Sequence, residues 1–121
     1  MILTNLYAFY GSLRRGQHNY DRFESHLQYR FSAWIRGYQL YSFGDFPFAV
    51  KTNQQAHRIL VEIFAISEME VEREIDELEL GYGYYQELIQ IDQLQVRLYL
   101  FKDQANYPLV LGGDWVKFYR S

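Results

Sequence analysis

The 121-residue sequence has no cysteine, which excludes disulfide scaffolds, thiolate nucleophiles and cysteine-rich zinc sites. It also has no apolar run near the roughly 20 residues of a membrane-spanning helix. No basic segment precedes the apolar residues at the N-terminus, as one would in a signal peptide. We therefore expect a cytoplasmic protein with no membrane partner.

An excess of one charge is lacking as well: 12 Lys and Arg face 15 Asp and Glu, a formal net charge of −3. This balance gives no general attraction for nucleic acid, and Arg14-Arg15 is too short a basic patch to supply one. The histidines, which are His18, His26 and His57, lack the i,i+4 spacing of a helical metal site. We expect no nucleic-acid partner, no metal and no cofactor.

Apolar and aromatic side chains, by contrast, are abundant. Hydrophobic residues make up 49% of the chain and aromatic residues 19%, with 12 Tyr and 9 Phe. A chain of this length and composition is able to bury a core and is not expected to be disordered. Repeats, low-complexity tracts and linkers are absent, so residues 1–121 are predicted to form a single domain.

The order of apolar and turn-forming residues predicts an α+β fold. About six strands and two short helices do not alternate regularly, which favours a small mixed β-barrel over a doubly wound sheet. Turn residues near Gly37 and at Asp92-Gln93 separate some of the strands. The expected strands cover residues 2–9, 28–42 (one or two strands), a short stretch through 50, 57–66, 85–91 and 94–101, and the first expected helix covers 19–27.

The strongest helix signal lies between Ser67 and Gly81. Ser67 and Glu70 have the spacing of a capping box, and Gly81 is expected to end the helix. Most of the acidic side chains between residues 68 and 79 are expected to form a solvated face. Glu79 differs, because it borders the apolar residues at the helix C-terminus, where burial and the helix dipole both raise a carboxyl pKa. It is a candidate base.

Two glycines, Gly11 and Gly16, flank four residues directly after the first expected strand. A phosphate-binding P-loop continues this spacing with Lys and then Ser or Thr, whereas Gln17 and His18 follow here. The ammonium and hydroxyl groups of that chemistry are therefore absent. An ordinary turn and a loop that binds through exposed backbone N–H groups both remain open.

Three motifs in this order resemble the γ-glutamylcyclotransferase-like family, whose pattern is Y-G-[ST]-L, then L-D-x-x-E, then Y-x-R. Here they are Tyr10-Gly-Ser-Leu13 after the first strand, Ile75-Asp-Glu-Leu-Glu79 at the helix end, and Tyr85 opening the next strand. The loop YGSLRRGQHNY is similar to the branch that includes γ-glutamylamine cyclotransferase. Residues 37–47 and 113–115 resemble small bacterial members, so the likeness covers nearly the whole chain.

The resemblance implies a small barrel with a pocket between the loop and the helix. Family members cyclise a γ-glutamyl group to 5-oxoproline and release an amine or amino acid, without a cofactor. The substrate implied here is a γ-glutamyl amine, peptide or amide. Carried over by position, the resemblance implies that the γ-glutamyl head group is held by the backbone of Tyr10, Gly11, Ser12 and Leu13. It implies that Glu79 is the acid–base residue and that Tyr85 lines the pocket.

Two departures from the family pattern leave other functions open. Glu87 stands at the family's arginine position, and Leu80 separates the glutamate from Gly81. A non-catalytic module that binds a small carboxylate metabolite in the same pocket is the first alternative, and an aromatic-rich interaction domain is the second. Glu79 favours the enzyme, whereas Glu87 favours the binding module.

Overall fold

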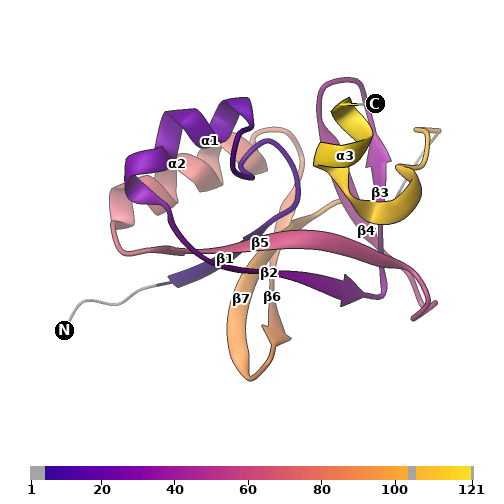
Figure 1. The fold of residues 1–121 in the computed structure, drawn as a ribbon. Coiled ribbons are helices and arrows are strands. Elements are labelled where there is room, and N and C mark those ends of the chain that lie inside the picture. Colours follow the sequence, from indigo (N-terminus) through magenta and orange to yellow (C-terminus); the bar gives the residue numbers. More distant parts are fainter. Residues whose placement is uncertain (1–4, 104–105, 121) are drawn as a thin grey trace.

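The computed structural model describes residues 5–103 and 106–120, which form an α+β domain (Figure 1). Residues 2–4 of the first expected strand lie outside the described residues. The strands are β1 (Asn5–Phe9), β2 (Gln28–Arg36), β3 (Tyr38–Ser42), β4 (Pro47–Lys51), β5 (Arg58–Ile66), β6 (Tyr85–Ile91) and β7 (Leu94–Leu100). The helices are α1 (His18–Phe23), α2 (Met69–Leu80) and α3 (Trp115–Arg120), with short 3-10 turns at Glu24–His26 and Leu111–Gly113.

The strands form two sheets. The larger has the order β2-β5-β1-β7-β6, and the smaller is the β3–β4 hairpin. β1 pairs antiparallel with β5, where Asn5 lies opposite Ile66, and parallel with β7, where Leu6 lies opposite Val96. β1 is therefore the central strand, and the loop that follows it begins in the middle of the sheet.

The expected α+β class is confirmed, but the closed barrel is wrong. Within residues 5–103 and 106–120, no pairing joins the outer strands β2 and β6 of the larger sheet. Gly37 adopts a φ of +88°, which lets the chain turn away after β2 so that β3 begins a separate hairpin. An isolated parallel bridge between Val50 and Phe101 connects this hairpin to the end of β7.

Helices α1 and α2 lie side by side over one face of the larger sheet (Figure 1). Arg22 of α1 and Glu74 of α2 form an exposed ion pair between them. α2 begins at Met69 with Glu68 as its N-cap and without a side-chain cap, so the expected capping box at Ser67 is wrong. The Glu68 carboxylate instead contacts His26 Nδ1 at 2.7 Å.

Helix α3 has no counterpart among the expected helices. It lies beside the β3–β4 hairpin (Figure 1), and the Tyr119 hydroxyl donates a hydrogen bond of 2.8 Å to Asp45 in the hairpin turn. Trp115 at its start is 1% exposed. The C-terminal helix therefore braces the hairpin from outside.

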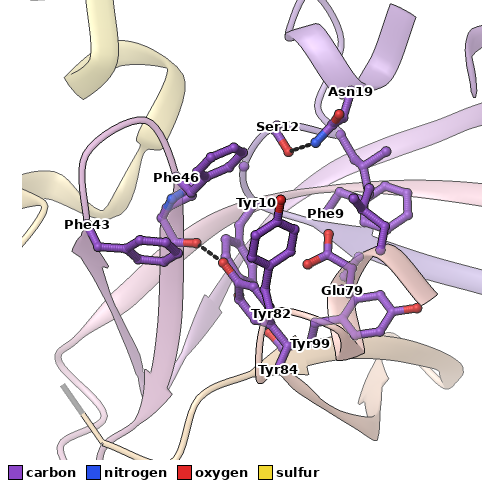
Figure 2. A pocket seen from close by; sticks show the side chains of 15 residues that line it. Phe9, Tyr10, Ser12, Asn19, Phe43, Phe46, Glu79, Tyr82, Tyr84 and Tyr99 are labelled. Carbon is purple, nitrogen blue, oxygen red and sulfur yellow. Dashed lines mark hydrogen bonds between the residues drawn. The ribbon is translucent and has the colours of Figure 1, made fainter. Parts of the chain in front are cut away.

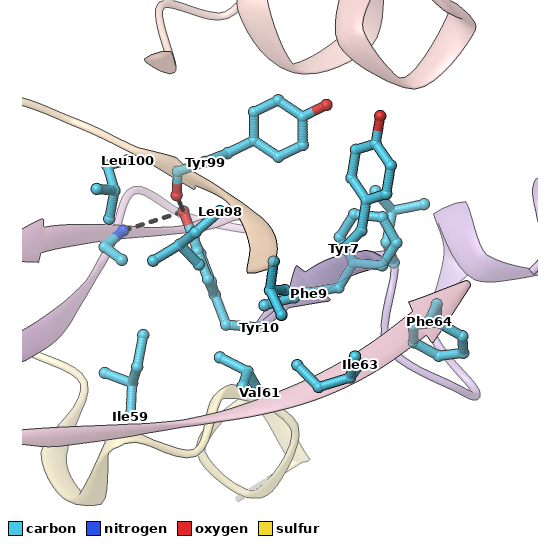
Figure 3. Packing of buried hydrophobic residues seen from close by; sticks show 14 of the residues in the cluster. Tyr7, Phe9, Tyr10, Ile59, Val61, Ile63, Phe64, Leu98, Tyr99 and Leu100 are labelled. Atoms are coloured by element: carbon cyan, nitrogen blue, oxygen red, sulfur yellow. Dashed lines mark hydrogen bonds between the residues drawn. The ribbon is translucent and has the colours of Figure 1, made fainter. Parts of the chain in front are cut away.

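The hydrophobic core is built mainly from the three central strands (Figure 3). Ile59, Val61 and Ile63 of β5 and Leu98 and Leu100 of β7 are fully buried. Burying one such side chain contributes about 1.5–3 kcal/mol. Because β1 runs between β5 and β7, this core fixes the position where its following loop starts.

Candidate active site

A cavity opens between the loop after β1, the end of α2 and the β3–β4 turn (Figure 2). Its volume, including the open mouth, is about 510 Å³. Side chains of both expected motifs line it, since Tyr10, Gly11, Ser12 and Leu13 face Glu79 across the same space. The structure therefore brings together five of the six residues singled out from the sequence.

The loop at Gly11–Leu13 is held by the start of α1. The carbonyl of Ser12 accepts hydrogen bonds from the backbone N–H groups of Asn19 and Tyr20, at 3.1 and 3.0 Å. The Asn19 side chain donates to the Ser12 hydroxyl at 2.7 Å. Because Ser12 Oγ accepts this bond, its own proton stays available for a ligand.

The backbone N–H groups of this loop lack protein acceptors. Nothing in the described part of the chain accepts a hydrogen bond from the N–H of Gly11, Ser12 or Leu13. Gly11 and Leu13 are buried and Ser12 is half-buried. Buried backbone donors are nearly always paired. Three successive unpaired donors at a cavity wall suit an oxygen-bearing ligand.

A largely buried ion-pair network ties the loop after β1 to β5 and to Asp114. Arg14 Nε lies 2.9 Å from Glu62 Oε2 on β5, and another nitrogen of the same guanidinium lies 2.8 Å from Asp114 Oδ1. The backbone N–H and Nε of Arg15 both reach Glu62 Oε1 at 3.0 Å. The Arg15 guanidinium also stacks on Tyr29 at 3.6 Å. Arg14 and Arg15 are therefore structural anchors, not a basic patch.

Removing the Glu62 carboxylate should destabilise the fold strongly. Glu62→Ala leaves the buried Arg14 with Asp114 alone, and breaking a buried pair costs about 3–5 kcal/mol. Chemical denaturation measures this as a lower free energy of unfolding. Glu74→Ala, which removes the exposed partner of Arg22, is the matched control and should cost less than about 1 kcal/mol. Equally small losses in both variants would contradict the anchoring role.

Three acidic residues of α2 point toward the sheet instead of into solvent. Glu72, Asp76 and Glu79 recur at i, i+4 and i+7, which places them on one helical face. Glu72 accepts hydrogen bonds from Asn5 Nδ2 at 2.6 Å and from Tyr7 OH at 2.9 Å. Glu72 and Asp76 therefore depart from the solvated face expected for most of the acidic residues, whereas Glu79 was already expected to differ from it.

Asp76, the middle residue of these three, holds the side chain of Tyr99, which lines the cavity together with Glu79. Asp76 accepts hydrogen bonds from the Tyr99 hydroxyl and, at 3.0 Å, from Gln86 Nε2. Burial and the Asp76 contact raise the pKa of Tyr99 above its ordinary value. Two consecutive anchors at Glu72 and Asp76 thus set the rotation of α2, and this rotation aims Glu79 into the cavity.

Among the described residues, Glu79 is the one ionisable carboxyl that lines the cavity. Figure 2 places its carboxylate across the pocket from Phe43 and Phe46. Burial raises its pKa from the ordinary 4.5 to about 7. The C-terminal end of α2 acts in the same direction, because the helix dipole disfavours a negative charge there. A carboxyl with this pKa takes up and releases protons near neutral pH.

Two tyrosines brace the cavity walls through their hydroxyls. Tyr10 OH donates to the carbonyl of Tyr99 at 2.7 Å and accepts from the N–H of Ala49 at 3.2 Å. Tyr84 OH donates to the carbonyl of Pro47 (Figure 2). Burial raises the pKa of both tyrosines above the ordinary value. They therefore stay neutral and tie β4 to the larger sheet.

Tyr85 does not line the cavity, which corrects the expectation for this residue. Successive side chains of an extended strand point to opposite sides, so Tyr84 turns inward and Tyr85 turns away. Tyr85 lies within electrostatic reach of Tyr38 and Lys51 on the hairpin. Glu87, at the family's arginine position, forms an ion pair with Lys51 and is likewise outside the cavity lining.

No individual role in the site was predicted from the sequence for several lining residues. They are Asn19, Phe43, Phe46, Tyr82, Tyr84 and Tyr99. Asn19 and the two tyrosines after α2 lie within about ten residues of the expected motifs, so proximity to those motifs was the available clue. Phe43 and Phe46 come from the distant hairpin turn, which reaches the cavity only through tertiary packing.

The fold and cavity define a small-molecule pocket on a mixed α+β domain. Residues 7–117 match the family described as gamma-glutamyl cyclotransferase, AIG2-like, and the chain belongs to this family. No curated protein matches the sequence. Within the described ranges, no cluster of three or more His, Asp or Glu side chains is arranged to hold a metal, and no helix is both long and apolar enough to cross a membrane.

Solved structures with the same fold come from bacteria, archaea and a mammal. An uncharacterized protein from Pyrococcus horikoshii is 26% identical, with a TM-score of 0.80 over 96% of this chain and 93% of that one. The protein ytfP from Escherichia coli is 29% identical, with a TM-score of 0.71 over 94% and 96%. An AIG2-like protein from Mus musculus is 18% identical, with a TM-score of 0.68 over 88% and 85%, a likeness of fold alone.

Proposed function

We propose that this protein is a γ-glutamyl cyclotransferase-type enzyme. It converts a γ-glutamyl amine, peptide or amide to 5-oxoproline and the free amine. The observation that carries the proposal is one cavity that holds both a carboxyl of pKa about 7 and three unpaired backbone donors. Family membership supports the same reaction class.

In the proposed reaction, Glu79 moves the proton. The substrate's α-amine gives a proton to the Glu79 carboxylate and attacks its own γ-carbonyl carbon, which forms the ring C–N bond. An α-amino group has a pKa of about 7.7–8.0, so a carboxylate of pKa about 7 nearly matches it, whereas an unperturbed glutamate is more than three units away. The protonated Glu79 then donates to the leaving nitrogen as the original amide bond breaks. The second proton lost by the ring nitrogen passes through the regenerated carboxylate to the released amine, so Glu79 ends the cycle ionised.

The loop supplies the binding and electrostatic part of the proposed reaction. The N–H groups of Gly11, Ser12 and Leu13 stabilise substrate oxygens, including the oxyanion that forms when the γ-carbonyl is attacked. The Ser12 hydroxyl adds a further donor. Because nucleophile and carbonyl belong to one molecule, the site mainly has to hold it in the bent conformation that cyclises. The reaction neither consumes nor releases water.

The test is release of 5-oxoproline from a panel of γ-glutamyl amines, peptides and amides at several pH values. The working base is ionised Glu79, so kcat/KM should fall about tenfold per pH unit below about pH 7 and level off above it. Activity that stays constant from pH 5 to 8 would contradict Glu79 as the base.

A panel with no turnover would favour the binding-module alternative. The motivating feature is Glu87, which stands at the family's arginine position and is paired with Lys51 outside the cavity. In the part of the chain that the structure describes, no basic side chain lines the cavity. Calorimetry with 5-oxoproline on the same protein separates the two cases. Binding without turnover identifies the module, whereas turnover of any panel member identifies the enzyme.

A further inference from the structure

We propose that the outer end of the cavity is an aromatic subsite that selects γ-glutamyl substrates whose leaving amine carries an aromatic ring and no charge of its own. This inference rests on the proposed function and names its substrate class. The subsite consists of Phe43 and Phe46 in the β3–β4 turn and Tyr82 in the turn after α2. It is called the aromatic subsite below.

The rings of the aromatic subsite already contact one another. Phe46 stacks with Tyr82 at a centroid distance of 6.0 Å and an interplanar angle of 28°, and Phe43 lies 6.0 Å from Phe46. His18 packs its ring edge against Phe46 at 5.5 Å. Aromatic rings prefer such offset and edge-on neighbours at 4.5–7 Å. A ligand ring entering here would find both kinds of contact.

Tyr82 is the exposed member of the aromatic subsite. It is 60% exposed, although it lines the cavity and is a large aromatic side chain. In the described part of the chain, its hydroxyl makes no hydrogen bond. By contrast, the hydroxyls of Tyr10 and Tyr84 are both engaged with backbone groups. Tyr82 therefore presents an open ring face at the mouth, where a leaving group would pass.

The charges around the cavity oppose a charged leaving group. Within residues 5–103 and 106–120, no Lys or Arg lines the cavity, so a leaving amino acid would bring a carboxylate without a cation to pair it. Glu79 is the sole carboxylate among the lining residues that the structure describes, and the proposed reaction already uses it. Asp45, in the same turn as the two phenylalanines, accepts the hydrogen bond from Tyr119. Transferring an unpaired charge into such a site is costly.

The two ends of the cavity fix which part of the substrate meets the rings. Ser12 and Asn19 line the cavity from the loop and α1, whereas Phe43 and Phe46 come from the β3–β4 turn, across from Glu79 (Figure 2). A γ-glutamyl head group bound at the loop places its amide bond beside Glu79. The leaving amine then extends toward the aromatic subsite.

Three matched substrates test the inference: γ-glutamylbenzylamide, γ-glutamylmethylamide and γ-glutamylphenylalanine. We expect kcat/KM for the benzylamide to exceed that for the methylamide by at least about tenfold, because even one methylene in an apolar pocket is worth about 10–200-fold. The phenylalanine adduct keeps the ring but adds a carboxylate, and it should fall at least about tenfold below the benzylamide.

A substitution at Tyr82 tests whether the aromatic subsite causes the preference for the benzylamide over the methylamide. Tyr82→Ala should reduce the benzylamide-to-methylamide ratio toward one. Trp34→Ala is the matched control, because Trp34 is also an exposed aromatic residue (41%) but lies on β2 and outside the cavity lining, so the ratio should not change. A ratio that is unchanged in Tyr82→Ala would overturn the role of Tyr82.

The outcomes separate this inference from the proposed function. If all three substrates release 5-oxoproline at equal efficiency, the aromatic subsite is overturned and the enzyme stands. If none does, the cyclotransferase is overturned for this class, and calorimetry decides the subsite on its own. Tighter binding of the benzylamide than of the methylamide would then support the subsite, and equal affinities would overturn it.

Discussion

Glu79→Gln should lower turnover by about 10²- to 10⁴-fold, the usual contribution of a general acid–base group. Glutamine keeps the size and helix propensity of glutamate but exchanges no proton near neutral pH. Affinity for the γ-glutamyl substrate should change far less, because the loop at Gly11–Leu13 supplies the binding. Steady-state kinetics of 5-oxoproline release, with kcat and KM determined separately, measures both effects.

Glu77→Gln is the control for this substitution. Glu77 lies on the same last turn of α2, but its side chain is exposed and outside the cavity lining. Its turnover should remain near that of the parent protein. An active Glu79→Gln beside an inactive Glu77→Gln would show that the acid–base residue has been assigned to the wrong position.

The same Glu79→Gln variant should be more stable than the parent above pH 7. The folded state raises the pKa of Glu79 from 4.5 to about 7, so the folded protein binds the proton more tightly than the unfolded chain does. The parent therefore loses stability as the pH rises from about 4.5 to 7. Glutamine removes this loss, which is about 1–3 kcal/mol after allowance for partial exposure, and the gain should vanish below pH 4.5.

The elements that the sequence predicted well are those determined by local patterns. The β6–β7 hairpin turns at Asp92 and Gln93, both with positive φ, as their position between two alternating strands indicated. The apolar spacing of α2 placed Glu79 beside the core, and the raised pKa follows from that position. Periodicity carries this information because neighbours along a strand or helix share a face.

The features that the sequence did not predict depend on contacts between distant segments. Whether the larger sheet closes into a barrel depends on pairing between its outer strands, β2 and β6. No local sequence pattern indicates whether these two strands pair, so the expected barrel could not be tested from the sequence. From the sequence, Arg14 was interpreted as part of a short basic patch. In the structure it forms an ion pair with Glu62 on β5, which is 48 residues away in the sequence. Asp76 likewise belonged to the acidic residues that were mostly expected to be solvated, although it accepts a hydrogen bond from the Tyr99 hydroxyl.

Gly11→Val should abolish binding of 5-oxoproline while the chain stays folded. A Cβ at position 11 would lie 2.6 Å from Pro47 Cγ, a distance that real Cβ atoms essentially never show, and 3.0 Å from Pro47 Cδ, which is also a tight contact. The φ of Gly11 is outside the left-handed region, so close packing and not backbone strain requires the glycine.

The Pro47 ring has little room to yield to a side chain at position 11. It is buried on β4, and the Tyr84 hydroxyl holds its carbonyl. A valine therefore has to displace the loop that carries the unpaired N–H groups, and both Gly11 and Pro47 line the cavity. Overpacking of this kind costs about 1–3 kcal/mol, which reduces stability without preventing folding. Calorimetry with 5-oxoproline and thermal denaturation measure the two effects.

Three further variants decide whether the contact between position 11 and Pro47 is responsible. Ser12→Thr should bind nearly normally, because the family pattern Y-G-[ST]-L accepts threonine at that position. Pro47→Ala removes Cγ and Cδ, so adding it to Gly11→Ala should restore binding that Gly11→Ala alone reduces. Contacting residues give such non-additive effects, whereas independent ones add. Unchanged affinity in Gly11→Val would mean that this loop does not hold the ligand. Strictly additive losses of affinity in the double variant would mean that Pro47 is not the residue that excludes a side chain at position 11.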